Sequence, residues 1–297
     1  MNITTEKSIC VFGEVLFDHL PDDTRVLGGA PFNVAWHLAA FGLAPDFISR
    51  VGSDAAGEEV RGAMGDWGMA LHGLQTDDIL PTGRVDVTLD ASGDASYDII
   101  DNCAYDAIEP FPVQSYSLLY HGSLAVRHAR TAACLQRLRE AGHGNIFMDV
   151  NLRAPHWTRD SVLALVRGAD WLKLNADELH LLAQGRGDTG SKARRLLETY
   201  QLRGLVVTSG SEGAELLLAT GERIKVVPRK TETVVDTIGA GDAFSAVLVM
   251  GLISQWPLED TMERCQEFAG SIVQRPGAIV TDRDFYRRFA TQWFPHD

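Results

Sequence analysis

The chain has 297 residues, of which 45% are hydrophobic and 23% charged, an ordinary composition for a globular protein that can bury a full core. The formal net charge of −13 argues against nucleic acid or an anionic membrane as a partner, although local backbone dipoles and a metal ion can still bind an anionic ligand. The four cysteines lack the paired spacing of zinc sites or disulfide frameworks, which indicates reduced thiols. Residues 1–8 are polar, unlike a signal peptide, and the apolar run from Ala243 is too short to span a bilayer, so we expect a soluble cytoplasmic protein.

The first predicted strand covers residues 9–13, and apolar alternation continues over residues 14–20. A double glycine, Gly28-Gly29, follows and precedes a helix predicted over residues 34–41. Two glycines let another molecule approach the backbone closely, with Asn33 near the helix start. A plain glycine turn with Pro31 near the first helical position explains the same residues.

The pattern changes over residues 84–100, after a strand predicted at 47–52 and a helix at 57–64. Val85 and Val87 alternate with polar residues, residues 92–94 form a turn, and apolar alternation returns afterwards. Such a hairpin has one apolar face, unlike a strand of a parallel sheet. It predicts a small sheet outside the main layer, with lid strands from about 14–27 and 84–105. A hinged lid, a plain β appendage and a contact in a homodimer are all compatible with this pattern.

From residue 118 onward, strands and helices alternate regularly. Strands are predicted over 118–122, 145–150, 171–174, 204–208, 224–227 and 234–235, and helices over 130–141, 161–167, 176–182 and 191–199. This alternation predicts an α/β fold with a doubly wound, mostly parallel sheet, in a single domain spanning residues 1–297. Ligands of such folds bind beyond the carboxyl ends of the strands.

Polar or glycine residues follow several of these strands. The set is Asp149, Asn151, Arg153, Asn175, Glu178, Thr208, Gly210 and Gly213. Each has a plain structural explanation: Asn175 and Glu178 resemble a helix capping box, and Arg153 resembles a surface loop residue. These explanations do not account for the recurrence of such residues at one edge of the sheet.

The segment V-D-T-I-G-A-G-D-A-F, residues 235–244, leads into an apolar run with the length and period of a buried helix. Gly239, Ala240 and Gly241 lie where the loop becomes the helix, so their N–H groups can surround an anion, assisted by the helix dipole. Asp242, in the first turn, can accept the proton of a hydroxyl that attacks a bound phosphoryl group. A tight turn with an acid neutralising the helix N-terminus is the alternative.

Other nucleotide-binding and hydrolytic motifs are absent from the sequence. No G-x-G-x-x-G follows the first strand, no P-loop occurs, and no G-x-S-x-G elbow is found. The nine histidines lack metal-ligand spacing. Dinucleotide-dependent dehydrogenases, P-loop enzymes and serine hydrolases are therefore disfavoured.

The motif D-T-I-G-A-G-D at residues 236–242 resembles the signature of the ribokinase-like carbohydrate kinases of the phosphofructokinase-B (PfkB) type. The G-G with Asn33, D-V-N-L-R at 149–153, N-x-x-E at 175–178 and T-x-G at 208–210 follow that family's order and approximate spacing. The resemblance covers nearly the whole chain.

This resemblance implies a kinase that uses ATP and Mg²⁺, with Asp242 as the base and the amides of Gly239, Ala240 and Gly241 around the transferring phosphoryl group. It also implies sugar binding by Asp18, Gly29, Asn33, Arg153 and Asp242, ATP binding by Asn175, Thr208, Gly210 and Gly213, and water-mediated Mg²⁺ binding by Glu178. Many members bind a monovalent cation such as K⁺ beside the anion site. The matching positions are Asp236, Ile238, Ile272, Arg275, Gly277 and Thr281, where Pro276 departs from the family pattern.

Gly13-Glu14 through Asp18, the G-G-A-P run and D-x-N-L-R with Trp157 look most like fructokinases, which implies conversion of D-fructose to fructose 6-phosphate. Ketodeoxygluconate kinases share several of these features, and ribose or nucleoside kinases are further alternatives. Outside enzymes, the alternative is a sugar- or nucleotide-sensing protein on a kinase fold. The intact Asp242 argues against a sensor, which has no need of a base.

Overall fold

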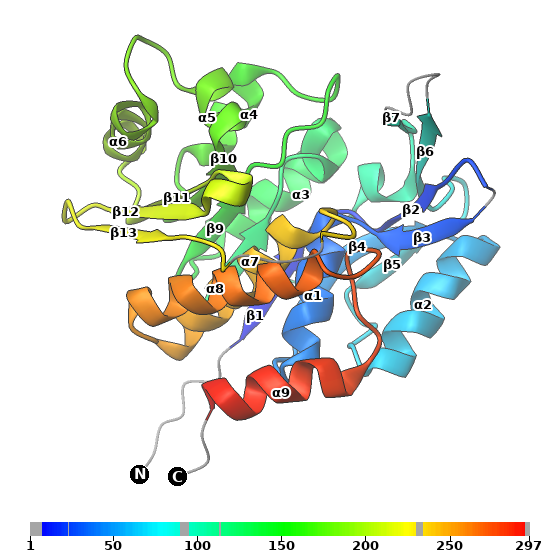
Figure 1. The fold of residues 1–297 in the computed structure, drawn as a ribbon. Helices are drawn as coiled ribbons and strands as arrows, with labels where there is room; N and C mark the ends of the chain where they lie inside the picture. The colour runs from blue at the N-terminus through cyan, green and yellow to red at the C-terminus, as the bar shows by residue number, and fades with distance from the viewer. Residues whose placement is uncertain (1–7, 23, 90–94, 113, 230–233, 295–297) are drawn as a thin grey trace, which may run out of the picture.

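The structure is a computed structural model that describes residues 8–22, 24–89, 95–112, 114–229 and 234–294 (Figure 1). The predicted turn at 92–94 and residues 1–7 of the polar segment lie outside these ranges. Within them, no helix combines the length and the apolar character needed to cross a bilayer. All four cysteines are buried free thiols.

In the described residues a sheet of nine strands forms the centre of the molecule, in the order β13-β12-β11-β10-β9-β8-β1-β4-β5. The strands are β1 Ile9–Phe12, β4 Asp46–Gly52, β5 Leu74–Asp77, β8 Leu118–His121, β9 Ile146–Asp149, β10 Trp171–Asn175, β11 Gly204–Thr208, β12 Ala214–Leu218 and β13 Arg223–Val226. Pairing is parallel from β5 to β11 and antiparallel at β12 and β13. The predicted mostly parallel α/β sheet is confirmed.

Three details of the sheet differ from the prediction. The edge strand β5 was not predicted, because its four residues alternate without a long apolar run. Val234 and Val235 form no strand, because the Val235 amide donates instead to the Val273 carbonyl at 2.8 Å, in a loop against α8 (Leu258–Ile272). The antiparallel strand β12 was not predicted, because its short apolar run follows a glycine-rich turn.

Helices cover both faces of the sheet (Figure 1). One face carries α1 Ala30–Ala40, α2 Ala55–Trp67, α7 Ala240–Ser254, α8 and α9 Arg283–Trp293, and the other carries α3 Ala129–Glu140, α4 Arg159–Val166, α5 Ala176–Leu182 and α6 Thr189–Tyr200. Residues 243–251 of α7 are all buried, since this helix packs between the sheet, α1 and α8. Each large apolar side chain buried in this way contributes about 1.5–3 kcal/mol.

A second sheet lies beside the main one, in the order β3-β2-β6-β7. Its strands are β2 Leu16–His19, β3 Arg25–Gly28, β6 Gly83–Leu89 and β7 Ala95–Ile99. Val85, Val87 and Ile99 are buried on one face against Tyr105, whereas Arg84 is exposed. This agrees with the predicted hairpin with one apolar face.

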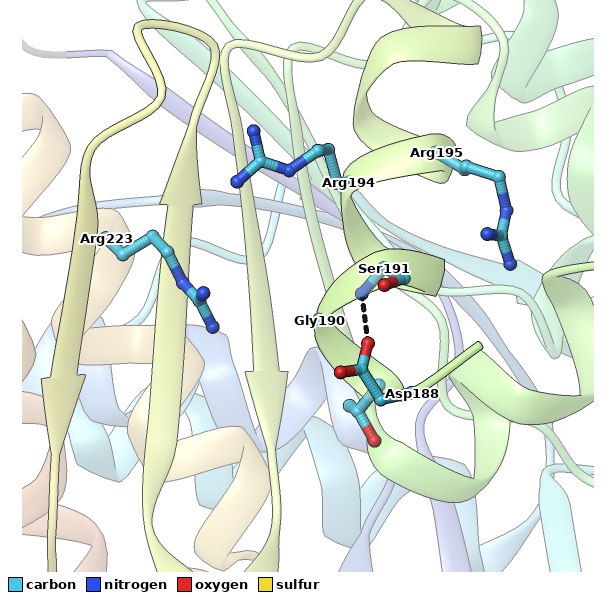
Figure 2. A pocket seen from close by; sticks show the side chains of 7 residues that line it. Asp188, Gly190, Ser191, Arg194, Arg195 and Arg223 are labelled. Atoms are coloured by element: carbon cyan, nitrogen blue, oxygen red, sulfur yellow. Dashed lines mark hydrogen bonds between the residues drawn. The ribbon is translucent and has the colours of Figure 1, made fainter. Parts of the chain in front are cut away.

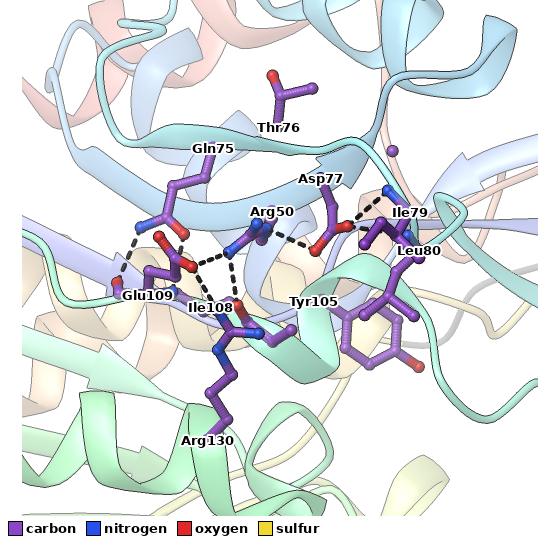
Figure 3. A network of polar contacts seen from close by, with 12 residues as sticks. Arg50, Gln75, Thr76, Asp77, Ile79, Leu80, Tyr105, Ile108, Glu109 and Arg130 are labelled. Carbon is purple, nitrogen blue, oxygen red and sulfur yellow. Dashed lines mark hydrogen bonds and ion pairs between the residues drawn. The ribbon is translucent and has the colours of Figure 1, made fainter.

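Arg50 of β4 fixes the chain that follows this hairpin (Figure 3). Its guanidinium forms ion pairs with Asp77 at 3.0 Å and Glu109 at 3.1 Å. It also donates to the Ala107 carbonyl at 2.9 Å, in the short 3-10 turn η1 (Ala104–Ala107). The turn η1, whose Tyr105 packs beneath the small sheet, is therefore bonded to strand β4 of the main sheet.

Candidate active site

The start of α7 presents backbone amides to the outside of the molecule. Gly239 precedes the helix with φ +77°, and a Cβ there would lie 2.4 Å from Ala278 Cα, so only glycine fits. The first intrahelical bond runs from Ala243 N to Gly239 O at 2.8 Å. The amides of Gly241 and Asp242 precede this bond, and Gly241 is exposed. This turn is therefore open to an anion.

Asp242 lies in the first turn of α7, as predicted, and is half-buried beside Gly241. Its Oδ2 accepts a hydrogen bond from Asn33 Nδ2 at 2.7 Å. Desolvation by the surrounding protein raises the pKa of this carboxyl to about 6, although the Asn33 hydrogen bond opposes the rise. The group is ionised at neutral pH and is still basic enough to accept a proton. Its side chain is therefore held inward by α1 and is not a solvent-facing helix cap.

Residues predicted to bind the sugar gather between this turn and the small sheet. A Cβ at Gly28 would lie 3.6 Å from Asp18 Oδ2 and 4.0 Å from Asn33 Oδ1, so both oxygens face this backbone. Gly29 has φ +111°, and a Cβ there would lie 2.7 Å from the Glu14 carbonyl oxygen. Asn33 Oδ1 is buried and has no hydrogen-bond partner in the described part of the chain. It is therefore available to a ligand hydroxyl.

Glu14 belongs to the same region, although the sequence reasoning gave it no role. Its side chain is 2% exposed, and Oε2 lacks a hydrogen-bond partner among the described residues. Burial raises the pKa of Glu14 to about 7, and the charge of Asp242 contributes to the rise. Burial also raises the pKa of Asp18, whereas Arg153 lowers the pKa of all three acids. A single acid after a strand has no distinguishing spacing, so only the structure could reveal Glu14.

The predicted nucleotide residues meet at the ends of β10 and β11, where Asn175 and Thr208 are paired in register. Asn175 Oδ1 accepts from Glu178 N at 2.8 Å, and Glu178 Oε2 accepts from Asn175 N at 2.8 Å, which confirms the predicted capping box. The turn after β11 closes through Ser209 N, which donates to the Gly213 carbonyl at 2.8 Å.

Glycine is required in this turn by its backbone conformation. Gly213 has φ +95°, and a Cβ there would lie 2.0 Å from the Val226 carbonyl oxygen of β13. Gly210 also has a positive φ, +52°, with open space around it. The loop after β11 is therefore held close to β13 by a contact that a larger residue at position 213 would block.

The environment of Glu178 is compatible with a water-mediated role at Mg²⁺. Besides its bond to Asn175, Glu178 Oε1 accepts from Leu152 N at 2.6 Å, and burial raises the pKa of this carboxyl. Each carboxylate oxygen has two lone pairs, so Glu178 can also accept from metal-bound water. Mg²⁺ usually keeps several of its waters in proteins, which suits this arrangement better than direct ligation.

The loops predicted to hold a monovalent cation are joined by Asp236. Its Oδ1 accepts from Ile238 N at 2.9 Å, and its Oδ2 accepts from Gly277 N at 3.0 Å. Ile272 and Arg275 form the adjoining turn, in which Arg275 N donates to Ile272 O at 2.9 Å. Of the six predicted positions, Thr281 is an exposed residue beyond this turn.

Two further features of the described residues lie outside this site. A hollow of about 580 Å³ at the start of α6 is lined by Asp188, Ser191 and three arginines, but Asp188 already caps the helix by accepting from Ser191 N at 2.8 Å (Figure 2). Asp101, Asp106 and His128 have ligand atoms within 4.8 Å of one another. Arg127 forms hydrogen bonds to both oxygens of Asp106 at 2.7 and 2.8 Å, so a cation is already present there.

Comparison with known proteins identifies the family of the chain. The family model described as pfkB family carbohydrate kinase matches residues 4–284. The chain is 30% identical over 290 residues to a fructokinase of Klebsiella pneumoniae, with 92% of each chain covered.

Two solved structures show the same fold. Aminoimidazole riboside kinase from Salmonella enterica, complexed with aminoimidazole riboside and an ATP analog, has a TM-score of 0.81 at 24% identity, over 95% of this chain and 99% of that chain. A double mutant of fructokinase from Vibrio cholerae, bound to fructose, ADP and potassium ion, has a TM-score of 0.77 at 23% identity, over 92% and 94%. The chain therefore belongs to the pfkB family of carbohydrate kinases, and it is an ATP-dependent sugar kinase.

Proposed function

We propose that this kinase transfers the γ-phosphoryl group of ATP to a primary hydroxyl of a ketose, with D-fructose as the substrate and fructose 6-phosphate as the product. The observation that carries the proposal is the first turn of α7, where the exposed Gly241 adjoins a carboxyl held by Asn33 at 2.7 Å. An anion site and a base next to each other are what phosphoryl transfer to an alcohol requires.

In this mechanism the oxygen of the sugar hydroxyl attacks the γ-phosphorus, and Asp242 accepts the proton of that hydroxyl. The bond from the γ-phosphorus to the bridging oxygen breaks, and ADP leaves. The amides of Gly239, Ala240 and Gly241 stabilise the charge on the transferring group, and removal of one such donor typically costs about 2.7–4 kcal/mol. Asn33 orients Asp242 through the observed hydrogen bond.

The ATP side of the proposal uses the ends of β10 and β11. Asn175, Thr208, Gly210 and Gly213 line the nucleotide site, and Glu178 would hold Mg²⁺ through water. The ion supplies charge neutralisation on the ATP phosphates. The loops joined by Asp236 would hold K⁺, as the matching motif suggests, through Asp236, Ile238, Ile272, Arg275, Gly277 and Thr281.

The charge around the sugar site favours a neutral polyol over a sugar acid. Glu14, Asp18 and Asp242 surround the region, whereas Arg153 is the cation that acts on all three. The carboxylate of ketodeoxygluconate would be repelled there, whereas the hydroxyls of fructose can donate to these acceptors. An aminoimidazole riboside is the second candidate, because that ligand is bound by the structural neighbour with the TM-score of 0.81.

We further propose that the small sheet is a lid over the sugar and that the enzyme is cytoplasmic. Arg84 and Asp98 are exposed on the sheet face away from the buried Val85 and Ile99, and such a polar surface suits a lid better than a homodimer contact. The buried free thiols suit a reducing compartment. Sedimentation of the purified protein at micromolar concentration tests whether the small sheet is a lid or a homodimer contact. A dimer broken by Arg84→Glu would contradict the lid assignment.

The experiment that tests the proposed function measures ADP formation against a panel of sugars, with and without K⁺. The panel contains fructose, ribose, ketodeoxygluconate, a nucleoside and aminoimidazole riboside. We expect the highest kcat/KM with fructose. Strong turnover of ketodeoxygluconate without turnover of fructose would overturn the choice of substrate, and sugar binding without any turnover would favour a sensor.

A further inference from the structure

Lys173 places a charge in strand β10, whose other buried residues are all apolar. Its side chain is buried in β10, whose neighbouring residues Leu172 and Leu174 belong to the core beneath α4, α5 and α6. Burying an ammonium group is costly unless it is paired. Lys173 Nζ donates to both oxygens of Asp149, at 3.0 Å to Oδ1 and 2.8 Å to Oδ2. The pair forms because Lys173 and Asp149 are register partners on adjacent parallel strands.

This ion pair contacts the first two turns of α7. The Ser245 hydroxyl lies within donating distance of Asp149 Oδ2, at 2.6 Å, and of the Gly241 carbonyl, at 3.0 Å. Tyr120 also donates to Asp149 Oδ2, at 3.2 Å. A Cβ at Gly241 would lie 3.6 Å from Lys173 Nζ. The ammonium group is therefore next to the turn that carries Gly241.

We propose that Lys173 is a positioning residue for phosphoryl transfer, which fixes the first turn of α7 through Asp149 and Ser245 and favours the ionised form of Asp242. The second part rests on the proposed base role of Asp242. Stability alone gives no reason for the pair, because replacing a buried ion pair by apolar side chains of similar size is often neutral or stabilising.

The electrostatic part follows from the charges around Asp242. The ionisable groups that act on it from other elements are Glu14 after β1, Tyr120 in β8, Asp149 in β9, Arg153 after β9 and Lys173 in β10. Burial raises the pKa of Tyr120 well above its ordinary value, so it stays neutral. Asp149 raises the pKa of Asp242, whereas Lys173 and Arg153 lower it.

Of the two cations, Arg153 is exposed and screened by solvent, whereas Lys173 is buried and acts at a lower effective dielectric. Without Lys173 the charge of Asp149 would be unopposed. The pKa of Asp242 would then rise above its value of about 6. A purely structural lysine would lower stability without such a change in the pH profile.

The test compares Lys173→Met, the double variant Asp149→Asn/Lys173→Met, and Ser245→Ala. Lys192→Met, on α6, is the matched control, because it removes a lysine that lies outside the site. For each variant, thermal unfolding, kcat, both KM values and the pH profile of kcat/KM with fructose or the best substrate are measured.

For Lys173→Met we expect the acidic limb of the profile to move up by about one pH unit and kcat to fall about tenfold or more. The double variant, which removes both opposing charges, should return the limb toward the wild-type position while kcat stays low. Ser245→Ala should keep the wild-type melting temperature and lower kcat with little change in KM, because alanine suits the helix.

A folded Lys173→Met enzyme with wild-type kcat and acidic limb would overturn the proposal. If Lys173→Met does not fold, wild-type kcat in both the double variant Asp149→Asn/Lys173→Met and Ser245→Ala would also overturn the proposal. Asp242→Asn is assayed in the same series: near-normal turnover there refutes the base role of Asp242, whatever Lys173→Met shows. The positioning of α7 by Lys173 is then judged from kcat alone.

Discussion

Asp242→Asn is the most direct test of the site, because it changes charge and basicity but keeps shape. The new amide oxygen can still accept from Asn33 Nδ2, which lies 2.7 Å from Asp242 Oδ2, so the orientation of the side chain should be retained. A positioned general base contributes roughly 10²–10⁴-fold, which corresponds to about 2.7–5.5 kcal/mol of barrier. We expect kcat to fall by this factor with little loss of ATP binding, since the anion is held by main-chain amides.

The pH profile gives a second measurement of the same group. Below its pKa the carboxyl is protonated and cannot accept a proton, so activity should fall as the pH drops through about 6, the raised pKa of Asp242. Wild-type kcat/KM should therefore fall about tenfold per pH unit below that value, and this limb should be absent in Asp242→Asn.

Asp260→Asn is the matched control, because Asp260 is an exposed acid in the first turn of another helix, α8. It reports what loss of an acid at a helix N-terminus does by itself, typically about 0.3–1 kcal/mol of stability. The assay is initial-rate ADP formation, with calorimetry for ATP binding. Turnover of Asp242→Asn within tenfold of wild type, or an unchanged acidic limb, would refute the reasoning.

Three further predictions test other parts of the site. Gly239→Ala should cost about 2–4 kcal/mol in the free energy of unfolding, measured by denaturant titration, and should lower kcat, because the new Cβ would lie 2.4 Å from Ala278 Cα at φ +77°. Gly270→Ala in α8 is the control: it has open space around it and should be neutral or stabilising in that titration. Equal effects of the two substitutions would argue against the close contact at Gly239. Asn175→Ala and Asp188→Ala each remove an N-cap, at about 1 kcal/mol of stability, but only the first should raise KM for ATP, and equal KM values would leave Asn175 as a cap alone. Arg153→Ala should raise KM for the sugar and move the acidic limb upward, because Arg153 lowers the pKa of Asp18 and Asp242; an effect confined to KM for ATP would contradict its assignment.

The sequence was sufficient for elements with strong local signals. The predicted bounds of α5 and β11 agree with the structure, since a capping box and a compact apolar run mark them. The start of α7 was predictable because Gly239, Gly241 and Asp242 precede a continuous apolar run. The strand predicted at residues 234–235 was wrong, because β-branched residues form a strand only where a partner strand is available.

Side chains that meet across strands could not be predicted in the same way. Lys173 and Asp149 are 24 residues apart, and their contact depends on the register of β9 against β10. A shift of one residue would turn one of the two side chains to the other face of the sheet. Glu14 likewise became a site residue only through its burial next to Gly29.

The burial of α7 has a consequence for how the enzyme loses activity on heating. Its first turn carries Asp242, and residues 243–251 are enclosed by the main sheet, α1 and α8. Amides of such a helix exchange with solvent only through opening of nearly the whole protein, whereas edge strands open locally. Thermal inactivation should therefore coincide with global melting, and the slowest-exchanging amides of the molecule should lie directly behind the reacting groups.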